Sequence, residues 1–127
     1  PRYSVVAYPF SDEYQNSNQW VLEVLAAAIA QSRDGTLLVR RAQVQTWLKE
    51  QMYLPSALHI GVGKRLGARF FSANAATTDH PASERVSGNY SVVTVESVFD
   101  FLQKRGVLAQ ELSVAHVPVA GMAAPKP

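Results

Sequence analysis

Residues 18–33 read NQWVLEVLAAAIAQSR and contain the longest apolar stretch of the chain. Apolar residues occupy almost every position from Val21 to Ile29, so a helix here is apolar on nearly all of its faces. Polar residues at 16–18 are typical helix starters, and Gly35 is typical of a helix end. Because such a helix must be packed on both sides, the sequence predicts a buried central helix around which the domain is built.

The rest of the chain contributes two more helices and two strands. Apolar residues recur at helical spacing in residues 40–52, which Pro55 follows, and in residues 96–105. Tyr3–Tyr8 and Tyr90–Val95 are rich in β-branched and aromatic residues, so both segments are predicted strands.

Residues 56–73 allow two interpretations, a short strand at Leu58–Ile60 and a glycine-interrupted helical turn at Lys64–Phe71. Strands separated by helices and long loops indicate an α+β domain, with the central helix packed on a small, mostly antiparallel sheet. Residues 1–116 are expected to form this single domain, and residues 117–127 form a tail rich in proline and alanine.

Two predicted strands are too few to cover the central helix. We expect the sheet to be completed by further strands within residues 56–85 and 107–118, by an upstream segment, or by a partner chain. Trp47, Tyr53 and the basic segment Lys64–Arg69 are candidates for a surface that contacts such a partner. Trp47 also lies on the apolar stripe of its own predicted helix, which favours a place in the core.

The composition excludes several functional classes. The chain has no cysteine, which excludes a disulfide scaffold, a thiolate zinc site and a cysteine nucleophile. Its net charge of +2 is too small to indicate binding to nucleic acid or to an anionic membrane. The longest apolar stretch, Trp20–Ala30, contains Glu23 and is about half as long as the roughly 20 residues of a membrane span. No signal peptide is visible in the sequence. No spacing typical of metal ligands is visible either, so neither a metal nor another cofactor is expected.

Ser17 lies where a loop meets the central helix, and two roles are open for it. As a nucleophile it would benefit from the positive end of the helix dipole and from free backbone N–H groups that can hold an oxyanion. The commoner role of Asn16, Ser17 or Asn18 is to cap those N–H groups.

A serine nucleophile needs a base, normally a histidine, which a third polar group orients. The histidines of the chain are His59, His80 and His116. His80, in the turn-like segment Asp79-His80-Pro81, is the preferred candidate. Asp79 is not expected to orient it, because neighbouring side chains usually point apart. The glycine-rich segment 61–67 lacks the spacing of a phosphate-binding loop and is predicted to be an ordinary loop.

Three segments resemble the bacterial exported family called domain of unknown function 2145. They are Tyr8-Pro9-Phe10 leading into YQNSNQWVLE at residues 14–23, Asp79-His80-Pro81, and TVESV at residues 94–98. The resemblance covers most of this chain as the C-terminal half of the family, and the usual N-terminal half is absent. It implies an exported protein that is periplasmic or secreted.

That family is in turn similar to circularly permuted NlpC-type papain-like hydrolases, in which a cysteine opens a buried helix. The resemblance implies a nucleophile position at Ser17, flanked by Asn16 and Asn18 and lined by Gln15, with the histidine upstream of Pro1. A serine hydroxyl cannot form the thiolate–imidazolium pair that a cysteine forms. A natural loss of the nucleophile, a working serine with another base, and an engineered replacement of cysteine all stay open.

Two functions from different classes follow. The first is a non-catalytic domain with a hydrolase-like fold that binds a partner protein or a cell-envelope component, and the lack of a complete catalytic set favours it. The second is a papain-like hydrolase that cuts an amide or ester in a cell-envelope component, with Ser17 as nucleophile and His80 as the candidate base.

Overall fold

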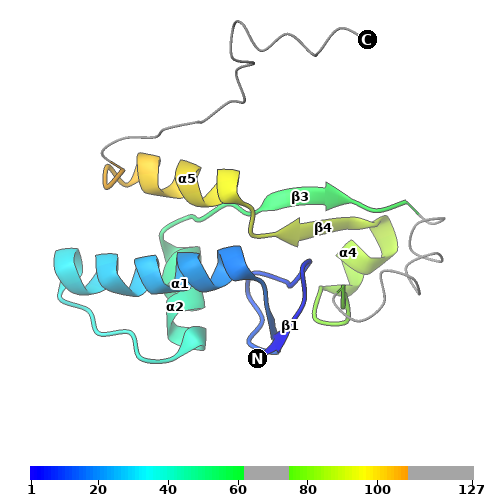
Figure 1. Ribbon diagram of the computed structural model, residues 1–127, viewed down its shortest axis with the longest axis horizontal. Helices are drawn as coiled ribbons and strands as arrows, with labels where there is room; N and C mark the ends of the chain where they lie inside the picture. Colours follow the sequence, from blue (N-terminus) through cyan, green and yellow to red (C-terminus); the bar gives the residue numbers. More distant parts are fainter. Residues whose placement is uncertain (62–74, 109–127) are drawn as a thin grey trace, which may run out of the picture.

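The computed structural model describes residues 1–61 and 75–108 of the chain. The fold is α+β, as predicted (Figure 1). In chain order its elements are β1 (Arg2–Tyr3), β2 (Tyr14–Gln15), α1 (Ser17–Ile29), a π-helical turn (Ala30–Asp34), α2 (Arg41–Glu50), β3 (Ser56–His59), α4 (Ala82–Ser87), β4 (Asn89–Val92) and α5 (Val95–Lys104).

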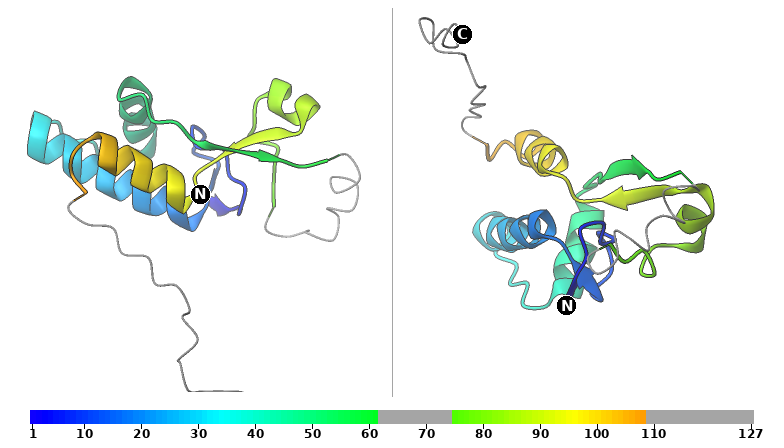
Figure 2. Two further views of the ribbon diagram at one scale, coloured as in Figure 1. Left: turned by 90° about the horizontal axis from the view of Figure 1, so that it is seen from above. Right: turned by 45° about the vertical axis from the view of Figure 1, so that its right-hand side comes forward.

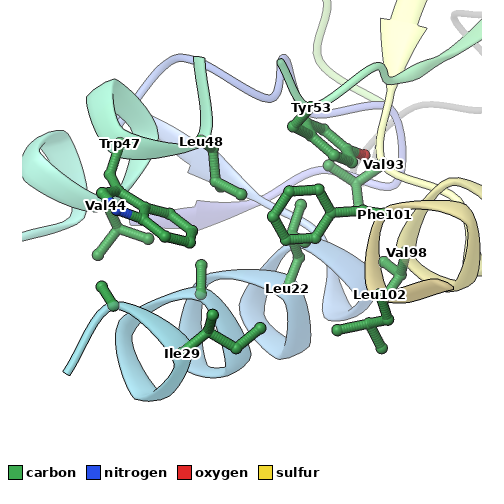
Figure 3. Packing of buried hydrophobic residues seen from close by; sticks show 12 residues of the cluster. Leu22, Ile29, Val44, Trp47, Leu48, Tyr53, Val93, Val98, Phe101 and Leu102 are labelled. Carbon is green, nitrogen blue, oxygen red and sulfur yellow. The ribbon is translucent and has the colours of Figure 1, made fainter. Parts of the chain in front are cut away.

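The hydrophobic core lies among α1, α2 and α5. α1 and α5 run side by side in the same direction, and α2 packs on another side of α1 (Figures 1 and 2). Leu22 and Ala26 of α1 and Leu48 of α2 are almost completely buried at its centre (Figure 3). The Phe101 ring of α5 meets Trp47 and Tyr53 edge to face, with centroids 6.3 and 5.7 Å apart. The central helix is therefore packed mainly on two helices and not on a sheet.

The strands form two separate two-stranded ladders. β1 and β2 pair in parallel over two residues each. β3 and β4 form an antiparallel ladder in which Ser56 pairs with Val92 and His59 with Asn89. This ladder extends away from the three core helices, and α4 lies near its far end (Figures 1 and 2). The strand interpretation of residues 58–60 is confirmed for Leu58 and His59.

The predicted strand Tyr3–Tyr8 was wrong beyond its first residue. After β1 the chain turns, because the backbone N–H of Ala7 donates to the carbonyl of Ser4 at 3.1 Å. Ser4 is fully buried and its hydroxyl donates to the carbonyl of Ala76 at 2.9 Å. The turn buries Val6 and Ala7, so the apolar residues that suggested a strand are used as core contacts instead.

The central helix is packed on two sides, by α2 and α5, but it is not buried all round as its apolar composition suggested. Trp20, Val21 and Val24 are 57%, 42% and 49% exposed. Conversely, Trp47 and Tyr53, candidates for a contact surface, are 6% and 4% exposed and belong to the core.

Two helices were predicted nearly to their ends, and one was missed. Residues 40–52 and 96–105 correspond to α2 and α5, whereas no helix was predicted at α4. The glycine-rich segment, the basic segment and the tail, with any strand beyond residue 108, lie outside the described residues.

Candidate functional site

Asn16 caps α1 and joins it to two other segments. Its Oδ1 accepts a hydrogen bond from the backbone N–H of Gln19 at 2.7 Å. Its Nδ2 donates to the carbonyls of Val5 at 3.2 Å and Val93 at 3.3 Å. With 5% exposure, Asn16 is buried, and its amide is fully used in fixing the start of the helix. The capping prediction is confirmed for this residue.

Ser17 is the first residue of α1 and is exposed to solvent. It lies in an open depression that it shares with Tyr3, Gln15, Asn16 and Trp20. Because Asn16 supplies the cap, the Ser17 hydroxyl is not required for that purpose. Within the part of the chain that the structure describes, this hydroxyl makes no hydrogen bond to another protein group.

The other two predicted binding residues flank Ser17, as expected from their place in the sequence. The Asn18 amide donates to the carbonyl of Val93 at 3.3 Å, so two neighbouring amides share this one acceptor. The Gln15 amide donates to the carboxylate of Glu23 at 2.8 Å. The side chains around Ser17 are thus held by contacts within the protein, and their roles in binding stay predictions.

Glu23 is the centre of a polar network that the sequence analysis missed. Its carboxylate is 6% exposed and receives two hydrogen bonds from Arg41, Nε to Oε2 at 2.8 Å and Nη2 to Oε1 at 3.0 Å. The amides of Gln15, Gln19 and Gln45 donate to the same carboxylate at 2.8, 3.3 and 3.1 Å. A buried carboxylate is tolerated because an opposite charge and several donors surround it.

Arg41 extends this network to the loop that precedes α1. Its guanidinium donates to the carbonyls of Asp12 at 2.8 Å, Tyr14 at 3.1 Å and Ser11 at 3.4 Å. The loop leading to the candidate site is therefore fixed to α2. The signal that could have indicated the network is a lone carboxylate within an apolar helix, which requires a partner elsewhere.

His80 is buried among acceptors. Its Nε2 lies 2.6 Å from the carbonyl of Val6, and its Nδ1 lies 2.8 Å from a carboxylate oxygen of Glu84. The ring is 3% exposed and contacts the rings of Tyr8 and Tyr90, with centroids 5.3 and 4.9 Å apart. Because a backbone carbonyl only accepts hydrogen bonds, Nε2 is the donor to Val6, and the contact of Nδ1 with Glu84 fixes the orientation of the ring.

Glu84, and not Asp79, orients the His80 ring. As expected, Asp79 makes no hydrogen bond to the ring, because its Oδ1 lies 3.9 Å from Nε2 while its Oδ2 accepts from the backbone N–H of Tyr8 at 2.8 Å. Burial raises the pKa of Glu84, but hydrogen bonds from the side chain of Ser91, from His80 and from the backbone of Ser91 outweigh it and lower the pKa below the ordinary value.

The described residues do not bring Ser17 and His80 together as a catalytic pair. His80 does not line the depression at Ser17, and its two ring nitrogens are already engaged by Val6 and Glu84. His59 is exposed on β3 and contacts the side chain of Asn89 at 2.7 Å. His116 lies outside the described residues. The catalytic assignment of Ser17 and His80 stays a prediction.

Residues 1–61 and 75–108 contain neither a metal-binding cluster nor a membrane-spanning helix. No group of three or more histidine, aspartate or glutamate side chains there is arranged to hold a metal ion. No helix in these ranges has the length and apolar character that crossing a membrane requires.

By its fold and its candidate site, the protein is a small α+β domain with a candidate site at the capped start of α1. The chain belongs to the family DUF2145, described as an uncharacterized protein conserved in bacteria, whose profile matches residues 1–102. The predicted family resemblance is therefore confirmed, while the more distant similarity to papain-like hydrolases is not shown. No curated protein and no solved structure gives a match to the chain.

Proposed function

We propose that this chain is a non-catalytic interaction domain of an exported bacterial protein, and that the exposed face of α1 binds an apolar polypeptide segment. The observation that carries the proposal is the apolar stripe on this helix. Trp20, Val21 and Val24 lie on one face with Ala28, because residues three and four apart are neighbours on a helix.

Both sides of the stripe are bordered by further apolar side chains. Toward α5, Val21 faces an open depression with Val95, Phe99 and Leu102. Toward α2, a second depression contains Trp20 and Val24. Its further lining includes the apolar Ala27, Leu38, Val39 and Val44, with the charged Glu23, Arg40 and Arg41 at the same depression. A contiguous apolar surface of this kind on a water-soluble domain is typical of a protein contact site.

The chemistry of the stripe favours a polypeptide as the occupant. None of its residues is charged, and the net charge of the chain is +2, which offers little attraction to nucleic acid or an anionic membrane. The occupant is expected to be uncharged where it meets Trp20 and Val24. Such an apolar segment can belong either to a longer form of this protein or to a separate protein. The photo-crosslinking experiment described next distinguishes these two sources.

Photo-crosslinking in the producing bacterium tests the proposal. A photoreactive amino acid replaces Val24 in the natural protein, and a matched variant carries it at Val86, an apolar residue that is 81% exposed on α4. We expect an adduct from position 24 that position 86 does not give, and loss of that adduct when Trp20 and Val21 are changed to glutamate. The mass of the adduct distinguishes an internal segment from a second protein. Equal labelling at both positions would contradict the proposal.

A hydrolase is the second candidate function, and the exposure of Ser17 favours it. A hydroxyl at the first residue of α1, beside a depression and free of the capping role, is accessible to a substrate. A fluorophosphonate probe, which modifies activated serines, separates the two functions. The non-catalytic function predicts no modification of Ser17. Labelling that Ser17→Ala abolishes, while His59→Ala preserves it, would support the hydrolase instead.

Export is proposed from the family resemblance alone. Fractionation of the producing bacterium with an antibody against the chain tests it directly. We expect the natural protein in the periplasmic or secreted fraction, and recovery with the cytoplasmic proteins would contradict this part of the proposal.

A further inference from the structure

Each strand of the β3–β4 ladder has backbone groups that face its partner and backbone groups that face outward. The N–H of Ile60 donates to the carbonyl of Gly88 at 2.8 Å, which makes this a hydrogen-bonded pair. In an antiparallel ladder such pairs recur every second residue, so Leu58 also bonds to Tyr90. The N–H and C=O groups of Ala57 and His59 must then point away from β4.

The outer edge of β4 is occupied by side chains from other elements. The N–H of Ser91 donates to the carboxylate of Glu84 at 3.0 Å, and the N–H of Asn89 donates to the hydroxyl of Ser87 at 3.2 Å. The carbonyl of Val93, just beyond the strand, accepts from the amides of Asn16 and Asn18. A further strand cannot pair here without breaking these contacts.

Within residues 1–61 and 75–108, nothing covers the outer edge of β3 in this way. Among the described residues, none forms a hydrogen bond with the outward backbone groups of Ala57 and His59. The side chains of Ala57, Leu58 and His59 are exposed, and β3 lies on the side of the two-stranded ladder that faces away from α1 (Figure 1). β3 also contains no charged residue and no proline, which are the usual protections of an edge strand.

We infer that the β3 edge pairs with the β3 edge of a second copy of this chain. The outward groups are self-complementary, since an antiparallel arrangement centred on Leu58 places Ala57 of each copy opposite His59 of the other. Each such pair exchanges two N–H···O bonds, and the two Leu58 side chains, each 40% exposed, then face one another. The net charge of +2 gives little repulsion between copies. Because the edge is short, we expect a weak dimer.

Sedimentation of the 127-residue chain over a range of concentrations tests the inference. We expect a reversible monomer–dimer equilibrium that Ala57→Lys weakens by about tenfold, because a charge at an exposed edge opposes pairing at both symmetric positions. The Val86→Lys variant is the matched control, since it adds the same charge at an exposed site on α4. Urea unfolding of each variant verifies that the monomer fold is retained.

A compensating variant tests the register. In the Ala57→Lys, His59→Asp double variant, each lysine faces an aspartate of the other copy, so the dimer is expected to recover. A monomer at all concentrations would overturn the inference. So would a dimer that Val24→Glu disrupts and Ala57→Lys does not, because the contact would then lie on α1. The inference is independent of the occupant proposed for the α1 face.

Discussion

Asn16 shows how a single side chain can assemble a site. Its Oδ1 completes the first turn of α1, and its Nδ2 links the turn before β2 to the end of β4. These contacts connect residues 11 and 77 positions apart in the sequence. The position of Ser17 therefore depends on its neighbour, and it does not depend on its own hydroxyl.

Replacing Asn16 with alanine is expected to destabilise the domain by about 2 kcal/mol, because a cap and two buried hydrogen bonds are lost. Asn18→Ala is the control, with an expected loss of about 1 kcal/mol or less because that amide makes one long bond. Asn16→Asp keeps the acceptor and removes the donors, so it should fall between them. Urea unfolding measures all three, and equal effects of the two alanine variants would contradict this assignment.

The pH dependence of stability is expected to report on Glu84. Its pKa in the folded protein is below the ordinary value of 4.5, so its contribution is fully present above pH 4.5. That contribution is lost as the pH falls through the lower pKa of the folded state. Urea unfolding between neutral pH and about pH 3 should therefore show a steeper acid loss in the natural protein than in Glu84→Gln. Parallel curves for the two proteins would exclude this role for Glu84.

At the scale of the elements, the Glu23–Arg41 pair fixes α1 to α2 and to the loop before α1. Arg41→Leu is expected to cost about 3 kcal/mol, because it leaves a buried carboxylate without its opposite charge. Glu23→Leu combined with Arg41→Leu should recover part of this loss, since two apolar side chains of similar size leave no unpaired charge. A double-mutant cycle in urea measures the coupling, and additive losses would show that the pair is not coupled.

The same elements show which parts of the fold could be predicted from the sequence alone. α1, α2 and α5 were predictable because apolar periodicity and caps such as Asn16 are local signals. The Tyr3–Tyr8 strand failed because the hydrogen bond from Ser4 to Ala76 spans 72 residues, and no local pattern encodes such a contact. Long-range contacts of this kind decide between a strand and a turn.

Part of the candidate site was within reach of sequence reasoning. His80 and Glu84 are only four residues apart, so their pairing is a local contact that the short separation could have suggested, although His80 itself precedes α4. The partner of Glu23 was not predictable in this way, because Arg41 lies 18 residues away on another helix. The hydroxyl of Ser17 and the ring of His80 were considered together because of their chemistry, which carries no information about distance.

At the scale of the whole molecule, the core is enclosed by three helices while one face of α1 stays open. The two tryptophans report on these two environments, because Trp20 is 57% exposed and Trp47 is 6% exposed. In a Trp47→Phe variant, acrylamide should quench the remaining fluorescence strongly, and in a Trp20→Phe variant it should quench weakly. Equal quenching in both variants would contradict the exposed α1 face. Protection of Trp20 by an added partner would then measure occupancy.

The support of residue 17 by its neighbours has an evolutionary consequence. Because Asn16 holds the start of α1 without help from the next side chain, the scaffold is retained whichever small residue follows it. Folding is therefore expected to place little constraint on the side chain at position 17.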